Sequence, residues 1–158
     1  MSSSDKENRF EEVAAAIDRL LQSDSTREQK LYGICEILNR NLPHYDWVGF
    51  YLVDPKNPHE LYLGPFIGEP TEHTRIPFGR GICGQAAETG TVFVVNDVSK
   101  ETNYLSCSLN VKSEIVLPLF RSGEVIGELD VDSHKPGNFN ADDMNFLAAI
   151  CEKVSLLF

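Results

Sequence analysis

Two kinds of apolar spacing divide this chain and most constrain how it can fold. Near both ends, apolar residues recur at the spacing of an amphipathic helix, in residues 10–21, in residues 28–40 and after Asn140, a suitable helix N-cap. The region between these helices changes to a period of two, or to short apolar runs bounded by turn residues. It predicts five strands, at residues 47–53, 61–66, 92–95, 115–120 and 125–131.

The turn between the last two strands indicates how the sheet is connected. Only residues 121–124, Arg-Ser-Gly-Glu, separate them. The two strands should therefore form an antiparallel hairpin, and a meander is favoured over a parallel sheet. At 158 residues, the chain has the size of one domain with a self-sufficient hydrophobic core.

The charge and the hydropathy pattern exclude several classes of partner. The formal net charge of -10 would repel a phosphate backbone, and the basic residues are scattered, so no nucleic-acid partner is expected. The N-terminus is polar, and no apolar run approaches the roughly 18 residues of a membrane span, so we expect neither export nor a membrane anchor. These observations favour a cytoplasmic protein.

The four cysteines fall into two classes by their surroundings. Cys35 and Cys151 lie on or beside helical apolar stripes, and we expect both to be core residues. Cys83 and Cys107 lie in turn-rich stretches 24 positions apart, and we interpret them as exposed thiols available for chemistry. The chain has no Cys-x-x-Cys and no histidine pair at ligand spacing, so neither a metal site nor a bound cofactor is expected.

Different segments carry the two thiols of the second class. A glycine-rich turn precedes a short helical segment that Gly90 would end, which places Cys83 near a helix start. Cys107 lies in residues 96–113, the longest irregular stretch inside the fold, and such loops are usually binding loops or lids. A loop cysteine with a lowered pKa is a nucleophile, whereas most lone loop cysteines are inert.

Carboxylates placed in otherwise apolar strands are the second chemical signal. Because side chains alternate along a strand, Glu128, Asp130 and Asp132 point to one face. That face is either the solvated side of an antiparallel sheet or a binding surface. Glu114 opens another apolar strand, where it is either a solvated strand-initiating charge or an acid with a raised pKa that can donate a proton.

Aromatic residues in the first strand provide a third signal. Trp47, Gly49 and Tyr51 share one strand face, which leaves a gap between two aromatic rings. A small apolar group of a ligand would fit that gap. A half-exposed aromatic pair in the core is the alternative.

Taken together, these segments resemble the free methionine-R-sulfoxide reductases of the GAF-domain type, over roughly residues 28–157. The motifs are Trp47-Val-Gly-Phe-Tyr-Leu, Leu63-Gly-Pro-Phe, Arg75-Ile-Pro-Phe-Gly-Arg-Gly-Ile-Cys-Gly, Cys107, Ser113-Glu-Ile-Val-Leu-Pro-Leu and Gly127-Glu-Leu-Asp-Val-Asp-Ser. The resemblance implies an α+β fold: a single GAF domain at residues 28–158, with an antiparallel sheet of about six strands and helices packed on it. Residues 1–27 would form an N-terminal helical extension.

The resemblance also implies a reaction and its residues. The implied residues are Cys107 as nucleophile, Cys83 as resolving cysteine, Glu114, Asp130 and Asp132 as substrate-binding and proton-handling acids, and Trp47 with Tyr51 as the cage for the methyl-sulfinyl group. The thiolate would attack the sulfur of free L-methionine-R-sulfoxide, and the resulting sulfenic acid would condense with the second thiol. An external dithiol reductant such as thioredoxin would reduce the disulfide.

The chain also departs from the pattern of that family. His73 stands ten residues before Cys83, where many members have a third cysteine, and Cys107-Ser-Leu-Asn replaces the usual Cys-Asp-Ala-Ala. Residues 95–100 look more like GAF domains of signalling proteins. A stand-alone sensor module that binds a small ligand without catalysis is therefore the alternative, and a GAF scaffold that serves as a homodimer is a third.

Overall fold

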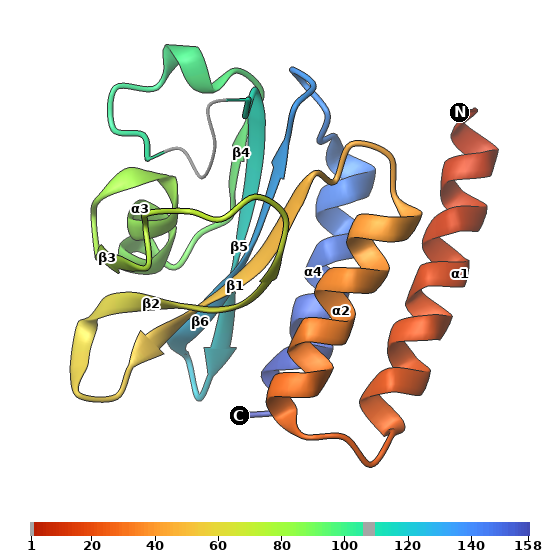
Figure 1. Ribbon diagram of the computed structural model, residues 1–158, viewed down its shortest axis with the longest axis horizontal. Helices are drawn as coiled ribbons and strands as arrows, with labels where there is room; N and C mark the ends of the chain where they lie inside the picture. The colour runs from red at the N-terminus through yellow and green to blue at the C-terminus, as the bar shows by residue number, and fades with distance from the viewer. Residues whose placement is uncertain (1, 106–109) are drawn as a thin grey trace.

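The computed structural model describes residues 2–105 and 110–158, so Cys107 lies outside the described residues. Along the chain the elements are α1 (Ser3–Gln22), α2 (Arg27–Asn41), β1 (Trp47–Asp54), β2 (Asn57–Ile67), β3 (Arg75–Pro77), α3 (Gly81–Thr89), β4 (Phe93–Val95), the 3-10 turn η1 (Val98–Lys100), β5 (Ser113–Arg121), β6 (Glu124–Ser133) and α4 (Ala141–Ser155) (Figure 1). Of these, only β3 and the short η1 turn have no counterpart in the elements predicted from the sequence.

The strands form a six-stranded sheet in the order β3-β2-β1-β6-β5-β4. Each neighbouring pair is antiparallel, and β5 and β6 form the hairpin predicted from their short turn. The expected α+β fold with an antiparallel sheet is confirmed. No helix among the described residues combines the length and the apolar composition that a membrane span requires.

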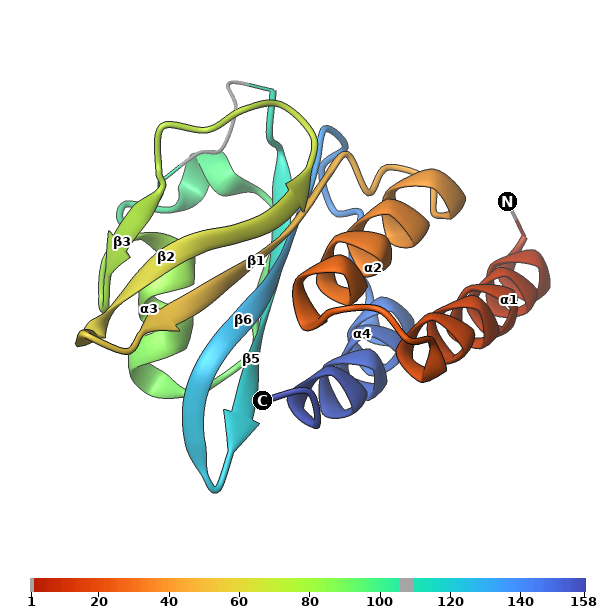
Figure 2. The same ribbon diagram turned by 60° about the horizontal axis from the view of Figure 1, so that its bottom comes forward.

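Helices cover both faces of the sheet and produce two separate cores. Figure 2 shows α1, α2 and α4 together on one side of the sheet and α3 on the other. Because side chains alternate along β1, Val48 and Phe50 enter the core beneath α2 and α4, whereas Trp47 and Tyr51 enter the core beneath α3. The chemistry-bearing residues belong to the α3 side.

Cys35 and Cys151 confirm the prediction that they are core residues. Both are buried in the larger core, among side chains of α1, α2, α4 and the sheet. Burial raises the pKa of both thiols, which keeps them protonated and unreactive.

Asp143 connects three segments on the side of the sheet that α1, α2 and α4 cover. Asn140 caps α4 as predicted, and its backbone N–H donates to Asp143 Oδ2 at 3.0 Å. Tyr45 Oη donates to Asp143 Oδ1 at 2.7 Å, and Lys6 Nζ donates to Oδ2 at 2.8 Å. Asp143 is fully buried, so these bonds compensate for the loss of its hydration.

We expect Asp143→Ala to lower the free energy of unfolding by about 2–4 kcal/mol, because it leaves the Tyr45 hydroxyl and a helix cap without their acceptor. Asp142→Ala is the matched control, since Asp142 is the exposed neighbour in the same first turn. Urea denaturation of both variants checks the difference. Equal losses in the two variants would contradict the role assigned to Asp143.

Candidate active site

A row of buried carboxyl groups lies on the α3 side of the sheet. Glu128, Asp130 and Asp132 share this face of β6 as predicted, and all three are fully buried. Glu114 of β5 lies directly opposite Asp132 in the sheet register and is buried as well. The solvated alternatives that the sequence left open, for the β6 acids and for Glu114, are therefore wrong.

Aromatic residues of β1 flank this row on its other side. In the register of β1 and β6, Trp47 lies opposite Asp132, Gly49 opposite Asp130 and Tyr51 opposite Glu128. Trp47 and Tyr51 are buried, with ring centroids 6.3 Å apart, so the idea of a half-exposed aromatic pair is wrong. Two strands thus bring aromatic rings and carboxyls to one surface.

The gap expected at Gly49 is filled by the Trp47 side chain itself. A Cβ at position 49 would lie 2.4 Å from Trp47 Cη2, because the indole ring folds over the glycine. The two aromatic side chains are held from outside the sheet. Trp47 Nε1 donates to the carbonyl of Glu69 at 3.0 Å, and Tyr51 Oη donates to the carbonyl of His73 at 2.8 Å.

Cys83 is the thiol that the structure places beside the acids. It is the third residue of α3, near the helix start as predicted, but it is only 6% exposed, so the expectation of an exposed thiol is wrong for Cys83. The reason is the close approach of α3 to β3: a Cβ at Gly84 would lie 2.6 Å from the carbonyl oxygen of Pro77. That approach presses Cys83 onto the sheet.

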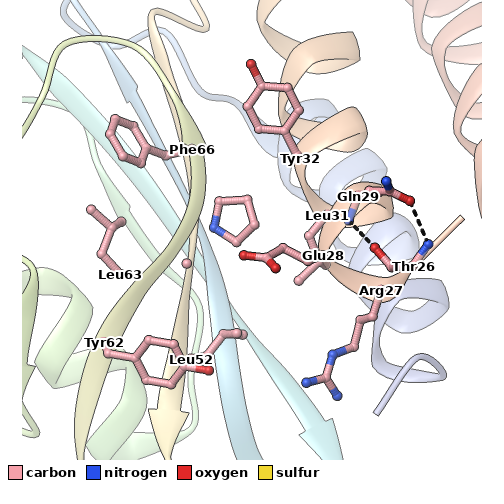
Figure 3. A pocket seen from close by; sticks show the side chains of 12 residues that line it. Thr26, Arg27, Glu28, Gln29, Leu31, Tyr32, Leu52, Tyr62, Leu63 and Phe66 are labelled. Carbon is pink, nitrogen blue, oxygen red and sulfur yellow. Dashed lines mark hydrogen bonds between the residues drawn. The ribbon is translucent and has the colours of Figure 1, made fainter.

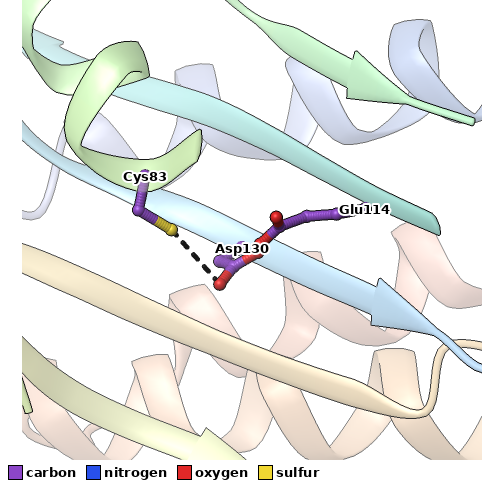
Figure 4. A group of neighbouring side chains, drawn as sticks. All are labelled: Cys83, Glu114 and Asp130. Carbon is purple, nitrogen blue, oxygen red and sulfur yellow. Dashed lines mark hydrogen bonds between the residues drawn. The ribbon is translucent and has the colours of Figure 1, made fainter. Parts of the chain in front are cut away.

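The Cys83 thiol donates a hydrogen bond to Asp130 Oδ2 at 3.3 Å. The Cys83 sulfur and one oxygen each of Glu114 and Asp130 all lie within 4.8 Å of one another. Figure 4 shows Cys83 reaching down from α3 while Glu114 and Asp130 extend from adjacent strands toward the same point. A thiol and two carboxyl groups from three elements therefore form one cluster.

Burial determines the protonation of this cluster. It raises the pKa of Glu114 well above its usual range, and the nearby Asp130 and Asp132 raise it further. Burial also raises the pKa of Glu128, as does Asp130, against a weaker opposing effect of the Cys83 thiol. The raised pKa predicted for Glu114 is thus confirmed. These acids hold protons that they would lose in water.

The raised pKa of Glu128 predicts how stability depends on pH. The folded state keeps a proton that the unfolded chain releases above about pH 4.5, so this contribution to stability is complete at low pH and is lost as pH rises through the folded pKa. The neutral isostere in Glu128→Gln should unfold at a higher temperature than the wild type at pH 8, and its melting temperature should fall less between pH 5 and pH 9. Thermal melts in the presence of a chelator measure both, and parallel pH profiles of the two proteins would contradict the expectation.

The space beside Cys83 is closed in this structure. Tyr51, His73, Arg80, Cys83 and Leu105 are among the residues around a small cavity that has no room for a water molecule. Leu105 is the last described residue before residues 106–109, which contain the predicted nucleophile Cys107. A ligand that enters this space must therefore displace side chains.

Asn103 and Glu128 are site residues that the sequence analysis did not assign. Asn103 Oδ1 accepts from the backbone N–H of Gly81 at 2.8 Å and Asn103 Nδ2 donates to the carbonyl of Gly79 at 2.8 Å, which attaches this part of the long loop to the start of α3. No sequence pattern points to this attachment. Glu128 could have been assigned from its alternation with Asp130, because the two share a strand face.

A larger groove lies elsewhere, between the start of α2 and strands β1 and β2. It has a volume of about 840 Å³, and Figure 3 shows the capping bonds between Thr26 and Gln29 at its rim. Its lining includes Glu28 and Tyr32 but neither a cysteine nor any acid of the buried row on β5 and β6. We therefore assign no catalytic role to this groove.

Comparison with known proteins agrees with this description. The family model described as GAF domain matches residues 25–158. GAF domain-containing protein A of Dictyostelium discoideum is 41% identical over 150 residues, which cover 95% of this chain and 92% of that protein. The free methionine-R-sulfoxide reductase of Escherichia coli is 39% identical over 121 residues, which cover 75% of this chain and 71% of that protein.

A solved structure shows a similarity that extends over the whole chain. The free methionine-R-sulfoxide reductase from Neisseria meningitidis, in complex with its substrate, matches with a TM-score of 0.91 and 38% identity. The match covers 100% of this chain and 93% of that one. The likeness in sequence therefore extends to the arrangement of the elements.

Proposed function

This chain belongs to the GAF domain family, and from that premise we propose that it reduces free methionine-R-sulfoxide to methionine. The observation that carries the proposal is the buried row of acids. The Cys83 thiol donates a hydrogen bond to Asp130 on one side of this row, and the rings of Trp47 and Tyr51 flank its other side. The similarity to reductases of the same name supports it. A proton donor, an anionic site for an amine and an apolar wall are the groups that this small substrate requires.

In the proposed reaction the Cys107 thiolate attacks the sulfoxide sulfur while the Glu114 carboxylic acid gives its proton to the sulfinyl oxygen. The oxygen and that proton end on the Cys107 sulfur as a sulfenic acid, and methionine leaves as the thioether. The substrate sulfur is thereby reduced by two electrons, and the cysteine sulfur is oxidised by two. The role of Glu114 agrees with its burial and its raised pKa.

Substrate recognition follows from the charge and shape of the same surface. The ammonium group of the amino acid pairs with Asp130 or Asp132, because a buried carboxylate is strongly stabilised by an opposite charge. Trp47 and Tyr51 contact the methyl-sulfinyl end. Because a peptide-bound residue has no such ammonium group, the free amino acid is the preferred substrate.

N-acetyl-methionine sulfoxide tests this assignment, since it differs from the substrate by the loss of the cationic amine. We expect it to bind and turn over much more weakly than the free amino acid in parallel assays with dithiothreitol. Equal turnover of the two compounds would show that the acids do not serve as the amine site.

Regeneration of the enzyme is proposed to use Cys83. Its thiol attacks the Cys107 sulfenic acid, water leaves, and the Cys83–Cys107 disulfide is then reduced by thiol–disulfide exchange with an external dithiol such as thioredoxin. Cys35 and Cys151 are poor alternatives because both are buried in the other core.

Peptide mapping of protein oxidised by substrate should find a single Cys83–Cys107 bridge. In Cys83→Ser the sulfenic acid should persist and react with dimedone, so that turnover with thioredoxin falls while turnover with a small thiol survives. A bridge to Cys35 or Cys151, or no bridge in the wild type, would overturn this role of Cys83.

A ligand-binding sensor without catalysis is the second candidate function. It is favoured by His73, which lines the cavity beside Cys83 at the position where many reductases of the family have a third cysteine. Calorimetry with methionine sulfoxide combined with product analysis separates the two candidates. A sensor binds the compound and returns it unchanged, whereas the reductase converts it to methionine.

A further inference from the structure

The acid row includes a carboxyl oxygen that is buried without a hydrogen bond from a described residue. This atom is Glu114 Oε1, and the side chain that carries it is buried. Buried carboxyls in this situation are neutralised by protons or by a cation.

The geometry of three of these donors matches a small, thiophilic cation. The Cys83 sulfur lies 3.3 Å from Asp130 Oδ2, and one oxygen of Glu114 completes a set of three atoms within 4.8 Å of one another. In a tetrahedral zinc site, Zn–S and Zn–O bonds of about 2.3 and 2.0 Å place sulfur and oxygen about 3.5 Å apart. Small shifts of the Glu114 side chain would complete such a site.

We propose that Cys83, Glu114 and Asp130 bind a divalent cation of the zinc type. A thiolate donor favours Zn²⁺ over Mg²⁺ and Ca²⁺, which require six or more oxygen ligands. On binding, the Cys83 thiol and the Glu114 carboxyl release their protons to solvent, and the cation replaces those protons as the neutralising charge. The unpartnered oxygen of Glu114 supplies one ligand, and the existing Cys83–Asp130 contact supplies the other two.

The cation would compete with the chemistry of the site. It occupies the carboxylate that pairs with the substrate amine and the acid that donates the proton, so Zn²⁺ inhibits sulfoxide reduction. This consequence rests on the proposed function, whereas the cation site itself does not. A bound cation would also prevent formation of the Cys83–Cys107 disulfide, because the coordinated Cys83 thiolate is not available for the resolving step.

A spectroscopic titration tests the site without any sulfoxide. Reduced, chelator-treated full-length protein is titrated with Cd²⁺, whose thiolate complexes absorb in the ultraviolet, and then with Zn²⁺ as competitor. We expect one equivalent of Cd²⁺ per chain and a charge-transfer band that Zn²⁺ removes. The band should be absent in Cys83→Ser and unchanged in Cys151→Ser, which removes a buried cysteine of the other core.

Glu114→Gln provides a second variant that conserves side-chain shape. It should weaken Cd²⁺ binding at least about tenfold, an effect reached even by the loss of an outer-sphere partner, while Glu124→Gln on the exposed end of the same hairpin should not. No band in the wild type, a band that survives in Cys83→Ser, or equal affinities for Glu114→Gln and Glu124→Gln would overturn the proposal. A titration that fails in a protein with sulfoxide turnover refutes only the cation site, and a successful titration in a protein without turnover refutes only the reductase.

Discussion

Replacing Cys107 by serine is expected to remove even a single turnover of methionine-R-sulfoxide, with a rate loss of at least about 10⁴-fold, because a serine hydroxyl cannot replace the attacking thiolate. Single turnover is the informative regime, since the first methionine is formed before any resolving thiol or external reductant is needed. The measurement mixes an excess of reduced protein with the sulfoxide and quantifies methionine after rapid quenching.

Cys35→Ser and Cys151→Ser are the matched controls for that loss. Both thiols are buried in the core beneath α2 and α4, on the opposite side of the sheet from the acid row. These variants should retain single turnover, with a loss confined to stability. Full single-turnover activity in Cys107→Ser would eliminate the proposed mechanism, whatever the controls show.

Glu114→Gln should lower kcat by about 10²–10⁴-fold, the usual effect of removing a general acid. The change keeps the shape of the side chain and removes its proton, which the wild type holds because burial and the neighbouring aspartates raise its pKa. Steady-state kinetics should show the effect mainly in kcat, while thermal melts show a folded protein of at least wild-type stability.

Glu124→Gln is the control for this second substitution. Glu124 is an exposed carboxylate at the start of β6. It lies opposite Arg121 in the strand register, at the turn of the same hairpin. Its replacement should leave kcat unchanged. If Glu114→Gln turned over as fast as Glu124→Gln, Glu114 would not be the proton donor.

The sequence was most informative where a local period determines the structure. Alternation along β6 placed Glu128, Asp130 and Asp132 on one face, and the turn after Arg121 predicted the hairpin. It could not say which face of the sheet is covered, because that depends on where α3 packs. The structure answers this by burying all three acids on the α3 side of the sheet, where the Cys83 thiol donates a hydrogen bond to Asp130.

Long-range packing explains the other differences between prediction and structure. The β3 strand has only three residues, too few for a period to appear in the sequence. The space above Gly49 looked open along the strand, but the Trp47 indole folds back over it, a rotamer choice that strand spacing does not specify. Asn103 reaches α3 from a distant loop, and only the folded chain brings these segments together.

A buried acid cluster of this kind reduces stability, so packing alone does not account for it. Glu114 and Glu128 would each be replaced without loss by an apolar residue if the α3 side of the sheet served packing alone. The fold instead buries both close to the Cys83 thiol. The expected pH dependence of stability and the proposed reductase activity therefore both depend on the same burial.

Product analysis with the two epimers of methionine sulfoxide tests the central claim most directly. The protein is incubated with dithiothreitol and with the R and S epimers, each as the free amino acid and within a peptide, and methionine is quantified. The account predicts methionine from the free R epimer, and little or none from the S epimer or from either peptide. Absence of methionine from the free R epimer, or equal conversion of the free and the peptide-bound forms, would contradict it.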